Sequence, residues 1–166
     1  MLELWHDTRF REERYAAIAL VRRRDYRAYR TLDAVPLYEQ LIVTGAWWDF
    51  VDEVAHLVGE LLRAHRAKMS ALMREWSRDE NLWERRVSII CQVGSKSETD
   101  LTVLYDCIEA NLGEREFFIR KAIGWAMRDY AWTDPREIDR YVHANAGRLS
   151  PLSRREAAKN LARLLA

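Results

Sequence analysis

The stretch GAWWDFVDEVAHLVGELL, residues 45–62, carries apolar side chains at intervals of three and four. At about 100° per residue these side chains fall on one broad arc of an α-helix, which predicts a helix with one buried face. Trp48 and Asp52 lie just outside the arc, one turn apart, so an aromatic ring and a carboxylate share a strip beside the core. Asp49 is interpreted as a solvated first-turn charge favoured by the helix dipole. The predicted core residues of this helix are Trp47, Phe50, Val51, Val54, Ala55, Leu57, Val58, Leu61 and Leu62.

The same helical spacing continues along almost the whole chain, and no segment alternates polar and apolar residues as a β-strand would. We therefore predict an all-α protein, with glycines and prolines mainly between the helices. Asp134 and Ser150 each precede a proline and are predicted N-caps. The helices are expected at residues 7–24, 35–43, 46–62, 68–76, 82–93, 99–111, 114–131, 135–145 and 150–164.

A repeat is visible in where the longer predicted helices begin, near residues 7, 46, 82, 114 and 150. A helix pair thus recurs about every 35 to 40 residues, which is typical of helical-repeat solenoids. Such pairs stack into a curved array, and we expect functional side chains on the concave face, drawn from successive repeats. The first residues suggest an apolar surface awaiting a cover, made of Leu2, Leu4, Trp5, Phe10 and Tyr15.

Composition limits the class of protein. A chain of 166 residues, 49% hydrophobic, can form one domain with its own core and needs no metal or disulfide to fold. A net charge of +1 excludes global attraction to a polyanion as the main evidence for function. Cys91 and Cys107 lie among apolar residues and are predicted to be buried thiols in a reducing cytoplasm. No signal peptide or membrane span is recognisable.

Arg86 is out of place in the predicted helix at residues 82–93, because it projects from the middle of the apolar arc. An unpaired guanidinium cannot be buried cheaply. Arg86 therefore either pairs with a carboxylate, which is the commoner arrangement, or opens into a polar cleft.

Lys121, Gly124, Trp125 and Arg128 share the stripe that borders the core face of the helix at 114–131. A glycine inside a helix costs about 1 kcal/mol relative to alanine, which suggests a close approach to the backbone. Basic side chains next to an exposed aromatic ring suit a phosphate backbone and sugar faces. The alternative is tight helix packing beside a solvated, charged face.

Four segments together carry a resemblance to a known family: WWDFVD (47–52), NLWERRVSIICQ (81–92), FFIRKAIGWAMRDYA (117–131) and LSPLSRREAAKN (149–160). They resemble the bacterial DNA alkylation repair family, HEAT-like-repeat glycosylases that excise 3-methyladenine and 7-methylguanine from DNA. The resemblance implies an α-α superhelix, one domain over residues 1–166, that is shorter than its relatives by about one N-terminal helix pair. It also implies a cytoplasmic, nucleoid-associated monomer whose partner is duplex DNA, with no obligate protein partner, no membrane and no cofactor.

By the same resemblance, Asp52, Trp48 and Trp125 are the catalytic residues, grouped around the deoxyribose of the lesion, and Arg86 is the essential arginine. Lys121 and Arg128 are predicted to bind DNA beside it. N3- or N7-alkylation makes the purine a cationic leaving group, so a carboxylate that stabilises an oxocarbenium-like sugar suffices. Arg86 could fix a flanking phosphate bidentately. Family members do not draw the modified base into a pocket, unlike most glycosylases.

Other functions are compatible with parts of the pattern. A short member of the family could be a non-catalytic DNA-binding module, and a helical array could be a protein-binding scaffold. A metal site is not predicted, because Asp52 and His56, four residues apart on one helix, give too few ligands.

Overall fold

The computed structural model describes residues 1–166 and contains helices only, which confirms the all-α prediction. Three 3₁₀ segments lie at Arg24–Tyr29, Leu32–Ala34 and Lys96–Glu98. No helix combines the length and the apolar character that a membrane crossing requires. The α-helices are α1 (Leu2–His6), α2 (Arg11–Arg22), α3 (Val35–Gly45), α4 (Trp48–Ala64), α5 (Arg66–Trp76), α6 (Leu82–Ile90), α7 (Leu101–Glu109), α8 (Phe117–Tyr130), α9 (Pro135–Ala144), α10 (Pro151–Ala158) and α11 (Leu161–Leu165).

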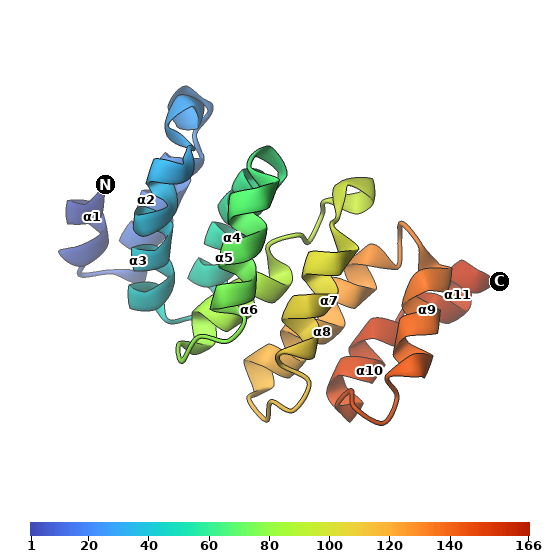
Figure 1. The fold of residues 1–166 in the computed structure, drawn as a ribbon. Coiled ribbons are helices and arrows are strands. Elements are labelled where there is room, and N and C mark those ends of the chain that lie inside the picture. The colour runs from blue at the N-terminus through green and yellow to red at the C-terminus, as the bar shows by residue number, and fades with distance from the viewer.

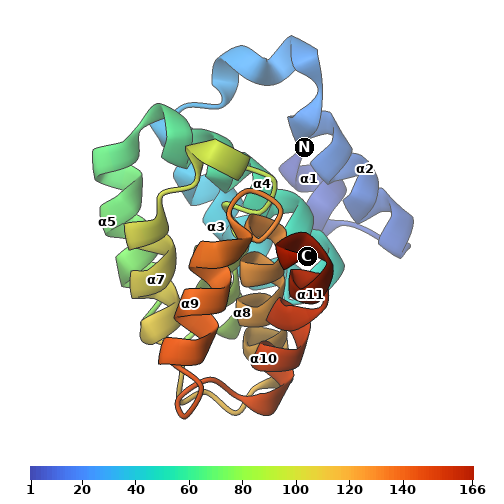
Figure 2. The ribbon, with the colours of Figure 1, turned by 90° about the vertical axis from the view of Figure 1, so that its right-hand side faces the viewer.

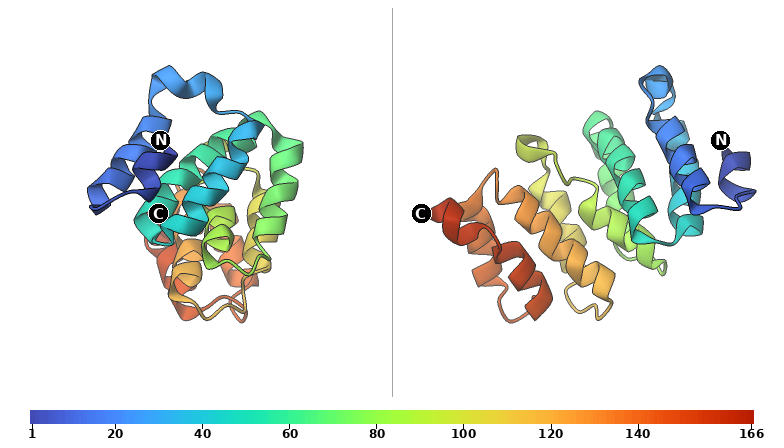
Figure 3. Two further views of the ribbon diagram at one scale, coloured as in Figure 1. Left: turned by 90° about the vertical axis from the view of Figure 1, so that its left-hand side faces the viewer. Right: turned by 180° about the vertical axis from the view of Figure 1, so that it is seen from behind.

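The helices form a two-layered array with the chain ends at opposite extremes (Figures 1 and 3). One layer consists of α2, α4, α6, α8 and α10, each packed on the next. Viewed along the array, α5, α7 and α9 lie on the other side (Figure 2). One apolar core of 37 buried side chains runs through the array, so successive helix pairs share a continuous interior.

The predicted repeat is confirmed by the helix starts, because α4, α6, α8 and α10 begin at residues 48, 82, 117 and 151, which are 34 or 35 residues apart. Polar contacts between neighbouring helix pairs join residues that are nearly the same number of positions apart in the sequence. The Arg74 guanidinium binds Asp106 at 2.7 Å, 32 residues later, and the Asn111 amide donates to the Ser77 carbonyl at 2.8 Å, 34 residues earlier. The array is therefore a helical-repeat solenoid held together by contacts between adjacent repeats.

Both N-caps predicted from the sequence are present. The Asp134 carboxylate accepts a hydrogen bond from the Glu137 backbone N–H at 3.0 Å, and the Ser150 hydroxyl accepts one from Ser153 at 3.0 Å. The last predicted helix instead divides into α10 and α11, because α11 turns to pack on α9. Helix α1 was not expected from the sequence.

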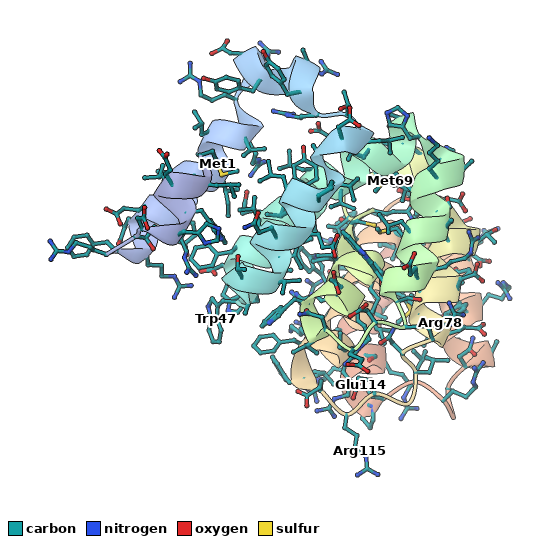
Figure 4. The ribbon with its side chains drawn as sticks, turned by 60° about the vertical axis from the view of Figure 1, so that its left-hand side comes forward. Met1, Trp47, Met69, Arg78, Glu114 and Arg115 are labelled. Atoms are coloured by element: carbon teal, nitrogen blue, oxygen red, sulfur yellow. The ribbon has the colours of Figure 1, made fainter.

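The start of α4 differs from the prediction and changes the place of Trp47. Ala46 adopts a left-handed conformation (φ 42°) and Trp47 is extended (φ −150°, ψ 139°), so the helix begins only at Trp48. The predicted core position of Trp47 is therefore wrong. Its side chain is 42% exposed and projects from the ribbon (Figure 4), with its ring 5.9 Å from that of Phe118. The other eight predicted core residues of α4 are buried.

Asp49 is not the solvated charge that the sequence suggested. It accepts hydrogen bonds from Arg11 and Tyr15 of α2, and only 17% of its side chain is exposed. The reason is that α2 packs beside the first turn of α4. Asp49 thus links two adjacent helices of the same layer.

The N-terminal residues divide into two groups. Trp5, predicted to be part of an uncovered surface, is fully buried, and its indole N–H donates to the Thr44 hydroxyl at 2.8 Å. The remaining members of the predicted apolar surface are exposed, namely Leu2, Leu4, Phe10 and Tyr15. Cys91 and Cys107 are buried free thiols, as predicted.

Candidate active site

One cavity of about 310 Å³ lies where α4, α6 and α8 meet, in three successive repeats. All six residues predicted from the sequence as functional line it. The residues predicted to lie beside the core on three separate helices therefore come together in one site when the repeats stack. The lining residues are Trp48, Asp52, Arg86, Phe117, Phe118, Lys121, Trp125 and Arg128.

The centre of this cavity is a bidentate ion pair. The Arg86 Nε donates to Asp52 Oδ1 at 2.7 Å, and a terminal nitrogen of Arg86 donates to Oδ2 at 2.8 Å. The Arg86 side chain is 4% exposed and that of Asp52 is 13% exposed. Two parallel charge-assisted hydrogen bonds fix the plane of the carboxylate as well as its position.

Arg86 also reaches the third helix of the site. Its other terminal nitrogen donates to the Phe118 backbone carbonyl at 2.7 Å, and its guanidinium carbon lies 6.0 Å from the centre of the Trp125 ring. Both alternatives considered for Arg86 are thus realised, because it pairs with a carboxylate and lines a polar cavity. Three of its five N–H donors are used in these contacts, and the bidentate phosphate contact expected from the sequence stays a prediction.

Two tryptophans line the same cavity as Asp52. Trp48 is the first residue of α4 and is exposed, and Trp125 lies on α8, partly buried against the core. The sequence did not single out Phe117 and Phe118 as cavity residues. Phe118 is partly buried against the core, and Phe117 is exposed at the start of α8.

The basic residues of the cavity share a carboxylate that the sequence prediction missed. Lys121 and Arg128 each lie 2.8 Å from the Glu156 carboxylate, which belongs to α10 and is 4% exposed. Burial alone would raise the pKa of Glu156, but hydrogen bonds from Lys121 and Lys159 outweigh it and lower the pKa to about 2. The glutamate is therefore ionised at neutral pH.

Gly124 owes its place to helix packing. A Cβ atom at this position would lie 2.4 Å from the Glu156 Cβ and 2.8 Å from the Ser153 carbonyl oxygen. The glycine lets α10 approach α8 closely, which is the packing alternative considered for the sequence. The chain contains no group of three or more His, Cys, Asp or Glu side chains placed to hold a metal ion.

Fold and cavity together define a helical-repeat protein with an aromatic-walled carboxylate site beside a basic cluster. The sequence model of the DNA alkylation repair enzyme family matches residues 1–161, so the chain belongs to that family. It is also similar to a solved structure described as "Predicted DNA alkylation repair enzyme from Enterococcus faecalis". The two are 31% identical with a TM-score of 0.84, over 97% of this chain and 74% of the other. No curated protein matches the chain.

Proposed function

We propose that this protein is a DNA glycosylase that removes cationic N3- or N7-alkylated purines from duplex DNA. The observation that carries the proposal is the Asp52 carboxylate, oriented by Arg86 in a cavity bordered by Trp48 and Trp125. Membership of the DNA alkylation repair enzyme family supports the same conclusion.

The reaction needs little from the protein apart from charge and orientation. Alkylation gives the purine a positive charge, so the bond between C1′ and the base breaks with its electron pair going to the base. The base leaves neutral, and the sugar becomes an oxocarbenium-like cation. Asp52 would stabilise this cation and accept a proton from the water that adds to C1′. No group is required to protonate the leaving base.

The aromatic residues have a compatible role. The π faces of Trp48 and Trp125 carry partial negative charge and attract cations, so they would favour the same charged sugar. Apolar aromatic side chains also lower the local dielectric constant, which strengthens the interaction between Asp52 and the cation. Arg86 would act as a positioning residue, because it is 4% exposed and donates to both Asp52 oxygens and to the Phe118 carbonyl.

Lys121 and Arg128 would hold the DNA. They line the cavity next to Trp125, and both are partly exposed. Contacts between basic side chains and phosphates position a duplex without reading its sequence. This fits an enzyme that recognises a lesion by the charge of its base.

The test is release of methylated bases from methylated duplex DNA under single-turnover conditions, measured by mass spectrometry. We expect release by the wild type, a decrease of at least about 100-fold in Asp52→Asn, and no change in Asp49→Asn. Asp49 is the matched control, because it lies one turn earlier on α4 and does not line the cavity. The proposal fails if the wild type binds DNA without releasing bases, or if Asp52→Asn is as fast as the wild type.

A further inference from the structure

Three cations converge on one carboxylate where α8 meets α10. Lys121 Nζ and Lys159 Nζ each lie 2.8 Å from Glu156 Oε1, and a terminal nitrogen of Arg128 lies 2.8 Å from Oε2. Lys121 and Arg128 belong to α8, and Glu156 belongs to α10. The cluster has a formal net charge of +2.

The cluster is polarised from inside to outside. The Glu156 side chain is 4% exposed, whereas the three cations are between 26% and 47% exposed. An ammonium group has three donors and a guanidinium has five. After their contacts with Glu156, all three cations keep donors for a ligand.

Fastening of the two helices does not by itself explain the cluster. Helices α8 and α10 already pack at Gly124, and the Ser153 hydroxyl donates to the Arg120 carbonyl at 2.8 Å. Burying a carboxylate with three cations costs desolvation, which apolar side chains would avoid. Two of the cations also line the cavity that contains Asp52.

We propose that Glu156 is a positioning residue that assembles a phosphodiester-binding subsite from Lys121, Arg128 and Lys159, beside the Asp52 cavity. The inference rests on the proposed function, because it places a phosphate of the damaged strand next to the reacting sugar. Glu156 holds the three cations at a common centre, so their free donors converge on one anionic group. Its low pKa, about 2, keeps the carboxylate charged across the physiological range.

The experiment pairs a protein substitution with removal of one phosphate charge in the DNA. Duplexes carry a stable abasic-site analogue and a single methylphosphonate linkage, placed in turn at each of the phosphates around that site. In the wild type, we expect one linkage to weaken binding by about tenfold or more, as for a charge-assisted contact. In Glu156→Gln, the same linkage should weaken binding less than about twofold, because the cations are no longer held together.

Glu137→Gln is the matched control. Glu137 is also an ion-paired glutamate, bound to Arg140 and Tyr105, but it lies on α9 away from the cavity. This variant should keep the full sensitivity of the wild type. If Glu156→Gln fails to fold, Lys121→Met serves in the same cycle, since Lys121 is partly exposed and its loss leaves Glu156 with two cations.

Equal penalties in the wild type and in the tested variant, at every linkage, would overturn the inference. Base release by the wild type is measured in parallel. If the wild type releases bases but the penalties are equal, only the subsite is refuted. If the wild type does not bind duplex DNA at low salt, the proposed function fails and the subsite fails with it.

Discussion

Replacement of Arg86 by methionine should destabilise the protein far more than loss of an ordinary surface ion pair. The substitution keeps the apolar stem but leaves the Asp52 carboxylate without its bidentate partner. It also removes the donor to the Phe118 carbonyl. Three helices from three repeats lose a common contact.

The magnitude follows from burial. Removing one partner of a buried pair costs about 3 to 5 kcal/mol, because the remaining charge is uncompensated. Asp52 is 13% exposed and keeps some access to water, so we expect about 3 kcal/mol, the lower end of that range. The double variant with Asp52→Asn removes the stranded charge, so its loss should be smaller than the sum of the single losses by about 2 kcal/mol.

Urea unfolding followed by circular dichroism at the helix band measures these free energies. Arg74→Met is the control, because Arg74 binds Asp106 at the same 2.7 Å distance while 37% and 42% of the two side chains are exposed. Its loss should cost at most about 1 kcal/mol. The reasoning is refuted if Arg86→Met costs no more than Arg74→Met, or if the two site substitutions are additive within about 0.5 kcal/mol.

Two further substitutions test packing and charge. Gly124→Ala should lower the free energy of unfolding in urea by about 1 to 3 kcal/mol, because its Cβ would overlap Glu156 and the Ser153 carbonyl. Gly113→Ala should cost less, because the space around Gly113 is open. Equal effects would contradict the close approach of α8 and α10. Burial and the hydrogen bond to Asp79 raise the pKa of Glu84 to about 7. The folded state therefore keeps a proton that the unfolded state loses, and the free energy of unfolding should fall as the pH rises from 4.5 to above 7. As the pH rises from 4.5 to 8, the free energy of unfolding of Glu84→Gln should therefore increase by about 2 to 3 kcal/mol relative to that of the wild type. A difference between the two proteins that does not change with pH would exclude this explanation.

Periodicity in the sequence predicted which side chains would meet in the cavity. Trp48 and Asp52 share a strip because they lie one turn apart within a helix, and Arg86 was conspicuous because it interrupts an apolar arc. One repeat separates Asp52 from Arg86, 34 residues, so stacking of successive helices brings the two together.

Other features depend on contacts that no local pattern encodes. Trp47 is exposed because the backbone turns at Ala46, which sets where the helix starts. Asp49 finds its partner Arg11 in another helix, 38 residues earlier. Glu156 looks like an ordinary charge in a helix until α10 packs on α8 through Gly124. Helix starts and partners between helices are set by tertiary packing, which a helical wheel does not contain.

The three-way contact of Arg86 has a mechanical consequence. Arg86 belongs to α6, and its guanidinium joins Asp52 on α4 to the Phe118 carbonyl on α8. One planar group therefore makes hydrogen bonds that depend on the spacing of three consecutive repeats. Solenoids bend by small rotations between neighbouring repeats. Any flexing that separates α4 from α8 must lengthen a hydrogen bond at Arg86 and turn the Asp52 carboxylate. The orientation of that carboxylate is therefore coupled to the curvature of the array at these three repeats.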